Sequence, residues 1–198
     1  MVITTLGNCQ TMALCRYIRI LKPVADVKFC TSNFIVRSHL FPQNREMFGD
    51  QVDYVISDMH EQKQRMIDSD FVLYQAMKLW PAGAHELTQA GLSDMNQQHP
   101  DMNMLSITSF KYNDNDPSLF EGMLTREHKN NVDIRATDII NKHPGKIVST
   151  SVKYPGHHNN PNAFYFLEVM REICTRWDWD YYSDEQYQTL LEEGYPFG

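Results

Sequence analysis

A cysteine stands at the point where the first predicted strand turns into the first predicted helix. The short, β-branched segment 2–6 is followed by Gly7, Asn8, Cys9 and Gln10, where a helical pattern begins. Unsatisfied N–H groups and the macrodipole at a helix start stabilise an anion and lower the pKa of a thiol. Cys9 is therefore a candidate nucleophile. The other three turn residues are candidates to hold an oxyanion or a phosphate.

The position of Cys9 also fits a purely structural role. In parallel α/β sheets, ligands gather at the carboxyl ends of the strands, and the turn after the first strand is a favoured place for a reacting group. Cysteine is, however, among the most buried residue types, and here it precedes a predicted core helix. Spacing alone leaves both interpretations of Cys9 open.

A second set of candidates lies in the loop YPGHHNNPN, between a predicted strand and the last long helix. His157 and His158 are candidate general bases, because the ordinary pKa of an imidazole suits proton transfer near neutral pH. If both strands run parallel, this loop reaches the same edge of the sheet as Cys9. Exposed loop histidines are the alternative. No metal site is predicted, because neither the histidines nor the four cysteines show ligand spacing.

The order of the predicted elements indicates an α/β fold of one domain, residues 1–198, in which helices flank a mostly parallel sheet. Residues 71–80 fit a helix or a strand, and we interpret them as a helix. Residues 81–131 are expected to form an irregular or helical excursion, and the acidic, aromatic segment 177–198 to pack against the domain or a second copy of the chain. The predicted strands are 2–6, 26–31, 52–57, 104–110 and 146–152, and the other predicted helices are 9–21, 59–67, 119–128, 132–142 and 162–176.

Composition argues against several classes of function. The net charge is -7, and the 18 Lys and Arg residues are scattered, which removes the basic patch expected of a nucleic-acid binder. No apolar run approaches the roughly 20 residues that span a bilayer. The N-terminal residues lack the pattern of a secretory signal. We therefore expect a cytoplasmic protein without a membrane span or a nucleic-acid partner, whose four cysteines are reduced thiols.

Two blocks of the sequence that contain the candidate site residues resemble those of a known family. A strand that ends in LGNCQ and enters a helix, with the late block HHNNPNAF before an amphipathic helix, resembles the WcbI-like family of capsular polysaccharide biosynthesis enzymes. The resemblance implies a three-layer SGNH/flavodoxin-like sandwich that binds coenzyme A or acetyl-CoA and moves an acetyl group onto a sugar hydroxyl. By position, Cys9 takes the place of the nucleophile, and His158, or otherwise His157, that of the base.

The same resemblance implies partners for the protein. The chain departs from the family pattern at one position. The partners would be a small acyl donor and a glycan acceptor, with Arg16, Arg37 and Lys153 as candidates to contact the nucleotide phosphates, a solvated surface being the alternative. The SGNH pattern has an aspartate three residues before its histidine, where Tyr154 and Pro155 stand here. An orienting carboxylate would therefore come from elsewhere in the chain.

Three hypotheses follow from these residues. The first is an acyl-CoA-dependent transferase, in which Cys9 is either a covalent nucleophile or part of a cradle for the acyl carrier. The second is a thiol hydrolase of the same architecture, which cleaves an ester or thioester with water. The third is a non-catalytic module for ligand binding or assembly.

Overall fold

The computed structural model describes residues 1–31, 55–56, 58–76, 89–149 and 160–194. The chain divides into two compact units, Met1–Ser106 and Ile107–Gly198, called the N-terminal and C-terminal units below. The prediction of one domain across residues 1–198 stays a prediction.

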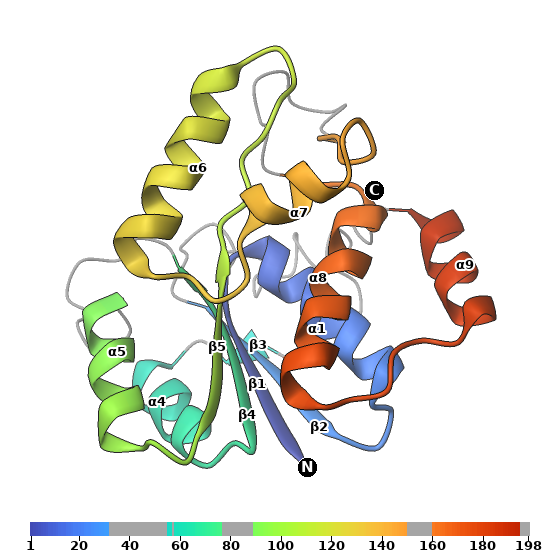
Figure 1. Cartoon of the computed structure of the whole chain (residues 1–198). Helices are drawn as coiled ribbons and strands as arrows, with labels where there is room; N and C mark the ends of the chain where they lie inside the picture. The colour runs from blue at the N-terminus through green and yellow to red at the C-terminus, as the bar shows by residue number, and fades with distance from the viewer. Residues whose placement is uncertain (32–54, 57, 77–88, 150–159, 195–198) are drawn as a thin grey trace, which may run out of the picture. The chain divides into compact units, whose positions relative to one another are not determined.

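The described strands form one sheet with the order β3-β2-β1-β4-β5, so that β1 lies in the middle (Figure 1). β1 pairs in parallel with β2 and with β4, and β2 pairs in parallel with β3. The predicted α/β class with a mostly parallel sheet is confirmed. The strands are β1 (Val2–Gly7), β2 (Asp26–Thr31), β3 (Val55–Ile56), β4 (Phe71–Ala76) and β5 (Asn103–Thr108).

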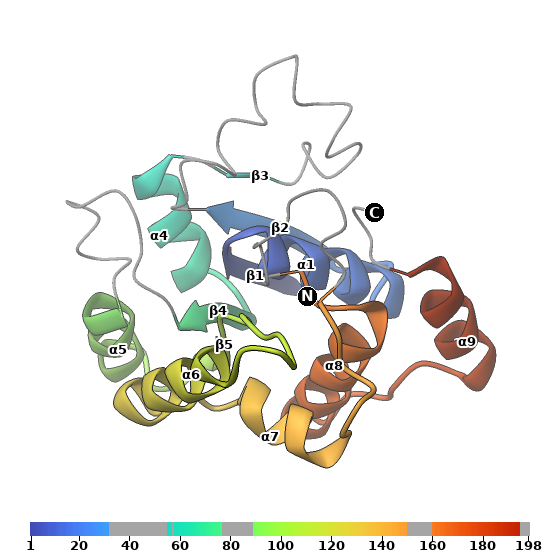
Figure 2. The same ribbon diagram turned by 90° about the horizontal axis from the view of Figure 1, so that it is seen from above.

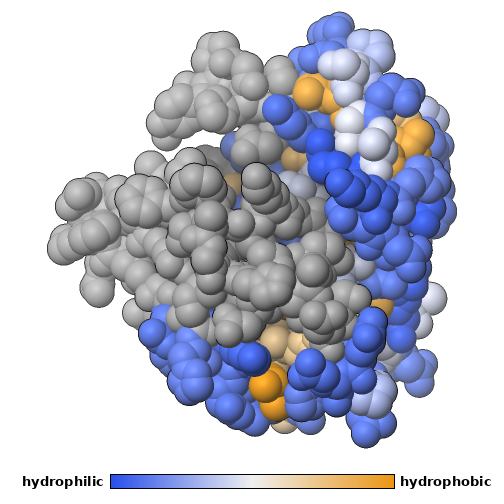
Figure 3. All heavy atoms as spheres, turned by 90° about the vertical axis from the view of Figure 1, so that its left-hand side faces the viewer, coloured by the Kyte–Doolittle hydropathy of each residue, from blue (hydrophilic) through white to orange (hydrophobic). Residues whose placement is uncertain are grey.

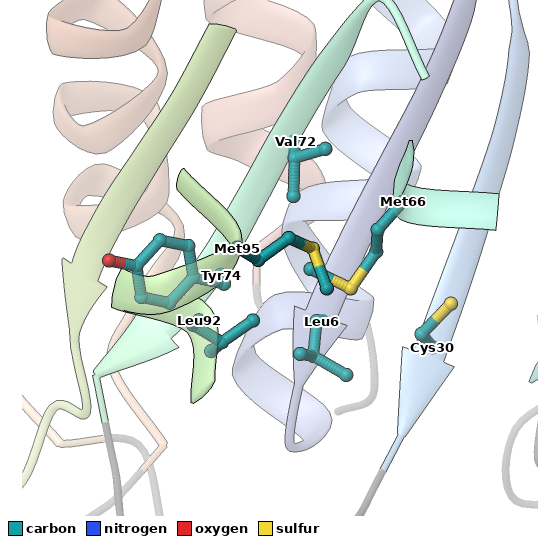
Figure 4. Packing of buried hydrophobic residues seen from close by; sticks show 7 residues of the cluster. All are labelled: Leu6, Cys30, Met66, Val72, Tyr74, Leu92 and Met95. Atoms are coloured by element: carbon teal, nitrogen blue, oxygen red, sulfur yellow. The ribbon is translucent and has the colours of Figure 1, made fainter. Parts of the chain in front are cut away.

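Helices cover both faces of this sheet within the N-terminal unit, in agreement with the expected three layers. Figure 2 shows α1 (Cys9–Leu21) on one face, and α4 (Met59–Ile67) and α5 (Gln89–Gln98) on the other. Successive side chains of a strand point to opposite faces, so each strand contributes to both layers of the core. The face toward α4 and α5 is shown in Figure 4 and holds Leu6, Cys30, Met66, Val72, Tyr74, Leu92 and Met95.

The helix that follows β1 has the bounds that the sequence predicts, residues 9–21. Its apolar positions are spaced to give a wide buried face, including Leu14 and Ile18, which are at most 1% exposed. It ends at Leu21, two residues before Pro23, because proline cannot continue a helix. Local sequence is therefore sufficient to define this helix.

The interpretation of residues 71–80 as a helix is wrong, because residues 71–76 form strand β4. Val72, Leu73, Tyr74 and Gln75 are all buried in succession, which a strand achieves when both faces of its sheet are covered. Such a continuous run shows neither helical nor alternating periodicity. Parallel pairing with β1 makes residues 71–76 a strand.

The C-terminal unit is mainly helical. Predicted helices 119–128, 132–142 and 162–176 are confirmed with shifted ends. Of the predicted strand 146–152, the described residues 146–149 hold an isolated antiparallel bridge from Ser149 to Pro161, and residues 150–152 lie outside the described part. The helices are α6 (Pro117–Asn130), α7 (Ala136–Lys142), α8 (Ala163–Trp177) and α9 (Asp184–Glu193).

The acidic, aromatic segment contains a helix that the sequence reasoning missed. Helix α9 begins with a capping box, in which Ser183 and Gln186 bond each other's backbone N–H groups at 3.2 and 3.1 Å. Arg171 of α8 lies 4.3 Å from the ring centroid of Tyr181, whose hydroxyl donates to the Leu167 carbonyl at 2.9 Å. The side chain of Tyr181 thus packs against α8 of its own unit.

The described surface carries few large apolar side chains. Met1, Val24 and Val148 are the exposed large hydrophobic residues among those described. Figure 3 shows one face on which the coloured surface is mainly hydrophilic, with apolar atoms in small separate groups. Within the described ranges, no helix has the length and apolar character to cross a membrane.

Candidate functional site

The turn after β1 is a capped junction between a strand and a helix. Asn8 is extended, with φ -101° and ψ -164°, and its Oδ1 accepts a hydrogen bond from the Gln10 N–H at 2.9 Å. The Asn8 carbonyl accepts from the N–H groups of Thr11 and Met12 at 3.0 and 3.1 Å. These bonds satisfy donors that the first turn of a helix otherwise leaves open. The junction lies at the carboxyl end of the middle strand, where parallel α/β sheets bind ligands.

Gly7 permits a close approach between this turn and strand β4. A Cβ atom at Gly7 would lie 2.1 Å from Thr11 Oγ1 and 2.8 Å from both Cβ and Oε1 of Gln75. Such distances are far inside van der Waals contact. The glycine is therefore required for space rather than for an unusual backbone conformation.

A set of buried polar side chains, which we call the amide cluster, holds the turn: Asn8, Gln10, Thr11 and Gln75. Gln75 Oε1 accepts from the Asn8 N–H at 3.0 Å and from the Thr11 hydroxyl at 3.2 Å. Gln75 Nε2 donates to Gln10 Oε1 at 2.7 Å. Gln75 is 1% exposed, and its hydrogen bonds offset the cost of removing its amide from water.

Gln75 is the site residue that the sequence reasoning missed. A signal was present, since a single glutamine interrupts the apolar run FVLYQA. Buried polar residues in such runs usually have specific partners. Interpretation of the segment as a helix hid the signal, because it removed Gln75 from the sheet edge that carries Gly7.

Cys9 is half-buried and carries a free thiol. Burial raises the pKa of this thiol, and the backbone N–H groups of Gln10 and of Cys9 itself offset only part of the rise. The N–H groups of the helix start do lower the pKa, as expected, but the loss of hydration outweighs them and the net shift is upward. Cys9 carries its proton at neutral pH and needs a general base to act as a nucleophile.

Two N–H groups of the turn are already engaged. The Asn8 N–H donates to Gln75 and the Gln10 N–H to Asn8 Oδ1. Asn8 Oδ1 accepts, so its Nδ2 group is the side-chain donor that remains, and it has no acceptor among the residues that the structure describes. An amide side chain of this kind can stabilise an oxyanion. Asn8 is thus the turn residue best suited to contact a ligand.

The other predicted site residues are distributed as follows. Arg16 lies in α1, about two turns after Cys9 and on the same side of the helix, about 10 Å further along its axis. The candidate bases His157 and His158, and the candidate phosphate contacts Arg37 and Lys153, lie outside the described residues. The structure therefore places the turn and Arg16, and the base stays a prediction.

Three pockets lined by described residues lie away from the turn. One of about 800 Å³ is formed where β1, β4 and β5 begin, with Asp70 and His99 in its lining. Two others, of about 380 and 410 Å³, lie in the C-terminal unit and are lined by residues that include Arg135 and His143 respectively. The described part of the chain holds no group of three or more His, Cys, Asp and Glu residues placed to bind a metal ion.

A second polar cluster, which we call the carboxylate cluster, lies in the C-terminal unit: Thr108, Glu127 and Thr137. Glu127 is 0% exposed and accepts hydrogen bonds from the hydroxyls of Thr108 and Thr137 and from the Thr137 N–H, the last at 3.2 Å. Thr108 Oγ1 in turn accepts from the Ala136 N–H at 3.0 Å. Because it is fully buried, Glu127 does not contact a ligand in this conformation.

Comparison with known proteins returned no family model, no curated protein and no solved structure that matches this chain. The chemistry of the site is therefore argued from the residues themselves.

Proposed function

We propose that this protein is an acyl-CoA-dependent acyltransferase that moves an acetyl or related acyl group onto a sugar hydroxyl during surface polysaccharide biosynthesis. The WcbI-like pattern of LGNCQ and HHNNPNAF supports the proposal. So does the capped turn at the carboxyl end of the middle strand, where Asn8 offers an amide donor without an acceptor in the described part of the chain. The proposed setting is the cytoplasm, and assembly through the segment 177–198 belongs to the same proposal.

The observation that carries the mechanism is the amide donor of Asn8 beside Cys9, and direct transfer needs no thiolate at Cys9, whose pKa is raised by burial. In direct transfer, His158, or otherwise His157, takes the proton of the sugar hydroxyl, and the hydroxyl oxygen attacks the thioester carbonyl. The new C–O bond forms, the C–S bond breaks, and coenzyme A leaves with the proton that the histidine returns. Asn8 Nδ2 would stabilise the oxyanion that develops on the carbonyl.

In this mechanism Cys9 is part of the cradle for the acyl carrier. A protonated, half-buried thiol is a compact, weakly polar surface, which suits contact with a thioester. Arg16, with Arg37 and Lys153, would contact the nucleotide phosphates.

Calorimetry with acetyl-CoA and a transfer assay with Cys9→Ala and His158→Ala test the proposal. We expect acetyl-CoA to bind, transfer to remain within about 10-fold of wild type in Cys9→Ala, and transfer to fall by about 100-fold or more in His158→Ala. His60→Ala is the control, since His60 is exposed on α4. Absence of acetyl-CoA binding, or unchanged transfer in both site variants, would contradict the proposal.

A ligand-binding module without catalysis is the second candidate, and the protonated thiol of Cys9 favours it over a thiol hydrolase. A hydrolase of simple esters would also need a base that takes the Cys9 proton. Binding of acetyl-CoA without turnover toward any sugar or water would identify the module. Ester hydrolysis that is lost when Cys9 is alkylated would identify the hydrolase instead.

A further inference from the structure

Gln75 bonds both residues that flank Cys9, and its orientation is fixed by chemistry. The Asn8 backbone N–H can only donate, so the Gln75 atom 3.0 Å away from it must be the amide oxygen. The amide nitrogen of Gln75 then faces Gln10 Oε1 at 2.7 Å. In the reverse orientation the amide nitrogen of Gln75 would face the Asn8 N–H, and two donors would meet without an acceptor. The Asn8 backbone therefore excludes that orientation.

The side chain of Asn8 is oriented by the same reasoning. The Gln10 backbone N–H lies 2.9 Å from Asn8 and can only donate, so the atom that meets it is Oδ1. Nδ2 is therefore directed away from the start of the helix. Asn8 is 8% exposed, and its Nδ2 has no acceptor within the described ranges. Nδ2 is not among the described polar atoms that are fully buried without a partner, so solvent or a ligand oxygen can reach it.

We propose that Gln75 is the positioning residue of this site: by holding Asn8 and Gln10 from strand β4, it makes the turn present hydrogen-bond donors to the ligand. The ligand group that meets the turn is then an acceptor oxygen, such as a thioester carbonyl or a carboxylate. The identity of the ligand as an acyl carrier rests on the proposed function, whereas the donor character of the turn does not.

The test compares the alkylation of Cys9 by iodoacetate and by iodoacetamide, followed by mass spectrometry. In both reactions the sulfur bonds to the CH2 carbon and iodide leaves, and only iodoacetate brings a carboxylate to the turn. The net charge of -7 works against iodoacetate, so an excess of its rate must arise locally. The rate with iodoacetate is divided by the rate with iodoacetamide, and this ratio is compared with the same ratio for Cys9 in the urea-unfolded chain. Cys9→Ser confirms the labelled site.

We expect the iodoacetate-to-iodoacetamide rate ratio to be at least about 5-fold higher in the folded protein than in the unfolded chain, because donors at the turn bind the carboxylate. Gln75→Leu should return the ratio to the unfolded value. Gln62→Leu is the matched control, because Gln62 is likewise buried, at 0% exposed against 1% for Gln75, but bonds the Ile56 carbonyl on the opposite face of the sheet. It should keep the wild-type ratio.

Asn8→Asp tests the donor itself without removing the helix cap, since aspartate caps helices as well as asparagine does. It replaces Nδ2 by an oxygen, so the ratio should fall below that of the unfolded chain, even if Gln75→Leu fails to fold. A wild-type ratio no higher than the unfolded value, or equal changes in Gln75→Leu and Gln62→Leu, would overturn the inference. The expected ratios without acetyl-CoA binding would instead overturn the proposed function and leave the role of Gln75 intact.

Discussion

The amide cluster of the N-terminal unit and the carboxylate cluster of the C-terminal unit occupy similar places, each at the carboxyl end of a strand and beside the first turn of a helix. In the carboxylate cluster, the acceptor oxygens of Glu127 have donors within the cluster, and Glu127 is 0% exposed. In the amide cluster, Asn8 retains a donor without an acceptor in the described part of the chain, next to the half-buried Cys9.

The two clusters differ in role: the carboxylate cluster contributes to stability alone, whereas the amide cluster can also bind a ligand. A buried carboxylate without a cation is tolerated when several donors satisfy it, and its removal then leaves those donors unsatisfied. A neutral amide cluster costs less to bury and can leave one group for a ligand. We therefore expect changes at Glu127 to alter the free energy of unfolding alone, and changes at the amide cluster to alter the chemistry of Cys9 as well.

Gly7→Ala should break the amide cluster and have the largest effect. Its Cβ would lie 2.1 Å from Thr11 Oγ1, so β4 and α1 must separate, and we expect a loss of about 3 kcal/mol in the free energy of unfolding measured with urea. Gly122→Ala in α6 is the control, because the nearest atom to its Cβ would be Arg126 Nη1 at 3.6 Å. That variant should be at least as stable as wild type.

Glu127→Ala should break the carboxylate cluster at nearly the same cost, about 3 kcal/mol, because three donors lose their acceptor. Glu127→Gln should cost less than half as much, since one amide oxygen still accepts and the charge is no longer buried. Urea unfolding measures both. In Glu127→Gln the alkylation rate of Cys9 should equal that of wild type, and a changed rate would disprove the separation of roles.

A matched pair of substitutions compares one hydroxyl in each cluster. Thr137→Val removes a hydrogen bond to a carboxylate and should cost about 2 kcal/mol, whereas Thr11→Val removes one to a neutral amide and should cost about 1 kcal/mol. Equal losses in urea unfolding would show that the charge of Glu127 does not strengthen its cluster.

The smallest effect at neutral pH concerns the thiols of the N-terminal unit. Burial raises the pKa of Cys9, so its alkylation by iodoacetamide at pH 7 should be slower than in the unfolded chain and should still increase above pH 9. Burial also raises the pKa of Cys15 to about 12. Stability that these protonated thiols contribute is fully present below their ordinary pKa of 9.0 and is lost as the pH rises toward the folded value.

Urea unfolding at pH 7 and pH 10 measures this loss. Stability should be lower at pH 10, because the unfolded chain releases protons that the folded chain retains. Alkylation of Cys9 at pH 7 that is faster than in the unfolded chain would contradict the raised pKa and restore Cys9 as a candidate nucleophile.

Local sequence predicted much of the fold. The bounds of α1 and β2 agree with the predicted 9–21 and 26–31, because apolar spacing and a following proline or turn define such elements without distant partners. The turn at Gly7–Gln10 was located for the same reason. The signal for α9, a serine three residues before a glutamine, was present but lay within a segment interpreted only as aromatic and acidic.

What the sequence determined by itself is the order of the elements, the mostly parallel sheet and the position of Cys9 at a strand-to-helix turn. The tertiary structure decided that residues 71–76 are a strand, that Gln75 bonds Asn8 from 67 positions away, and that the pKa of Cys9 is raised. The physical reason is the separation along the chain over which each interaction acts. Helix periodicity and caps act between near neighbours, whereas strand pairing, partners of buried amides and desolvation depend on segments that only folding brings together.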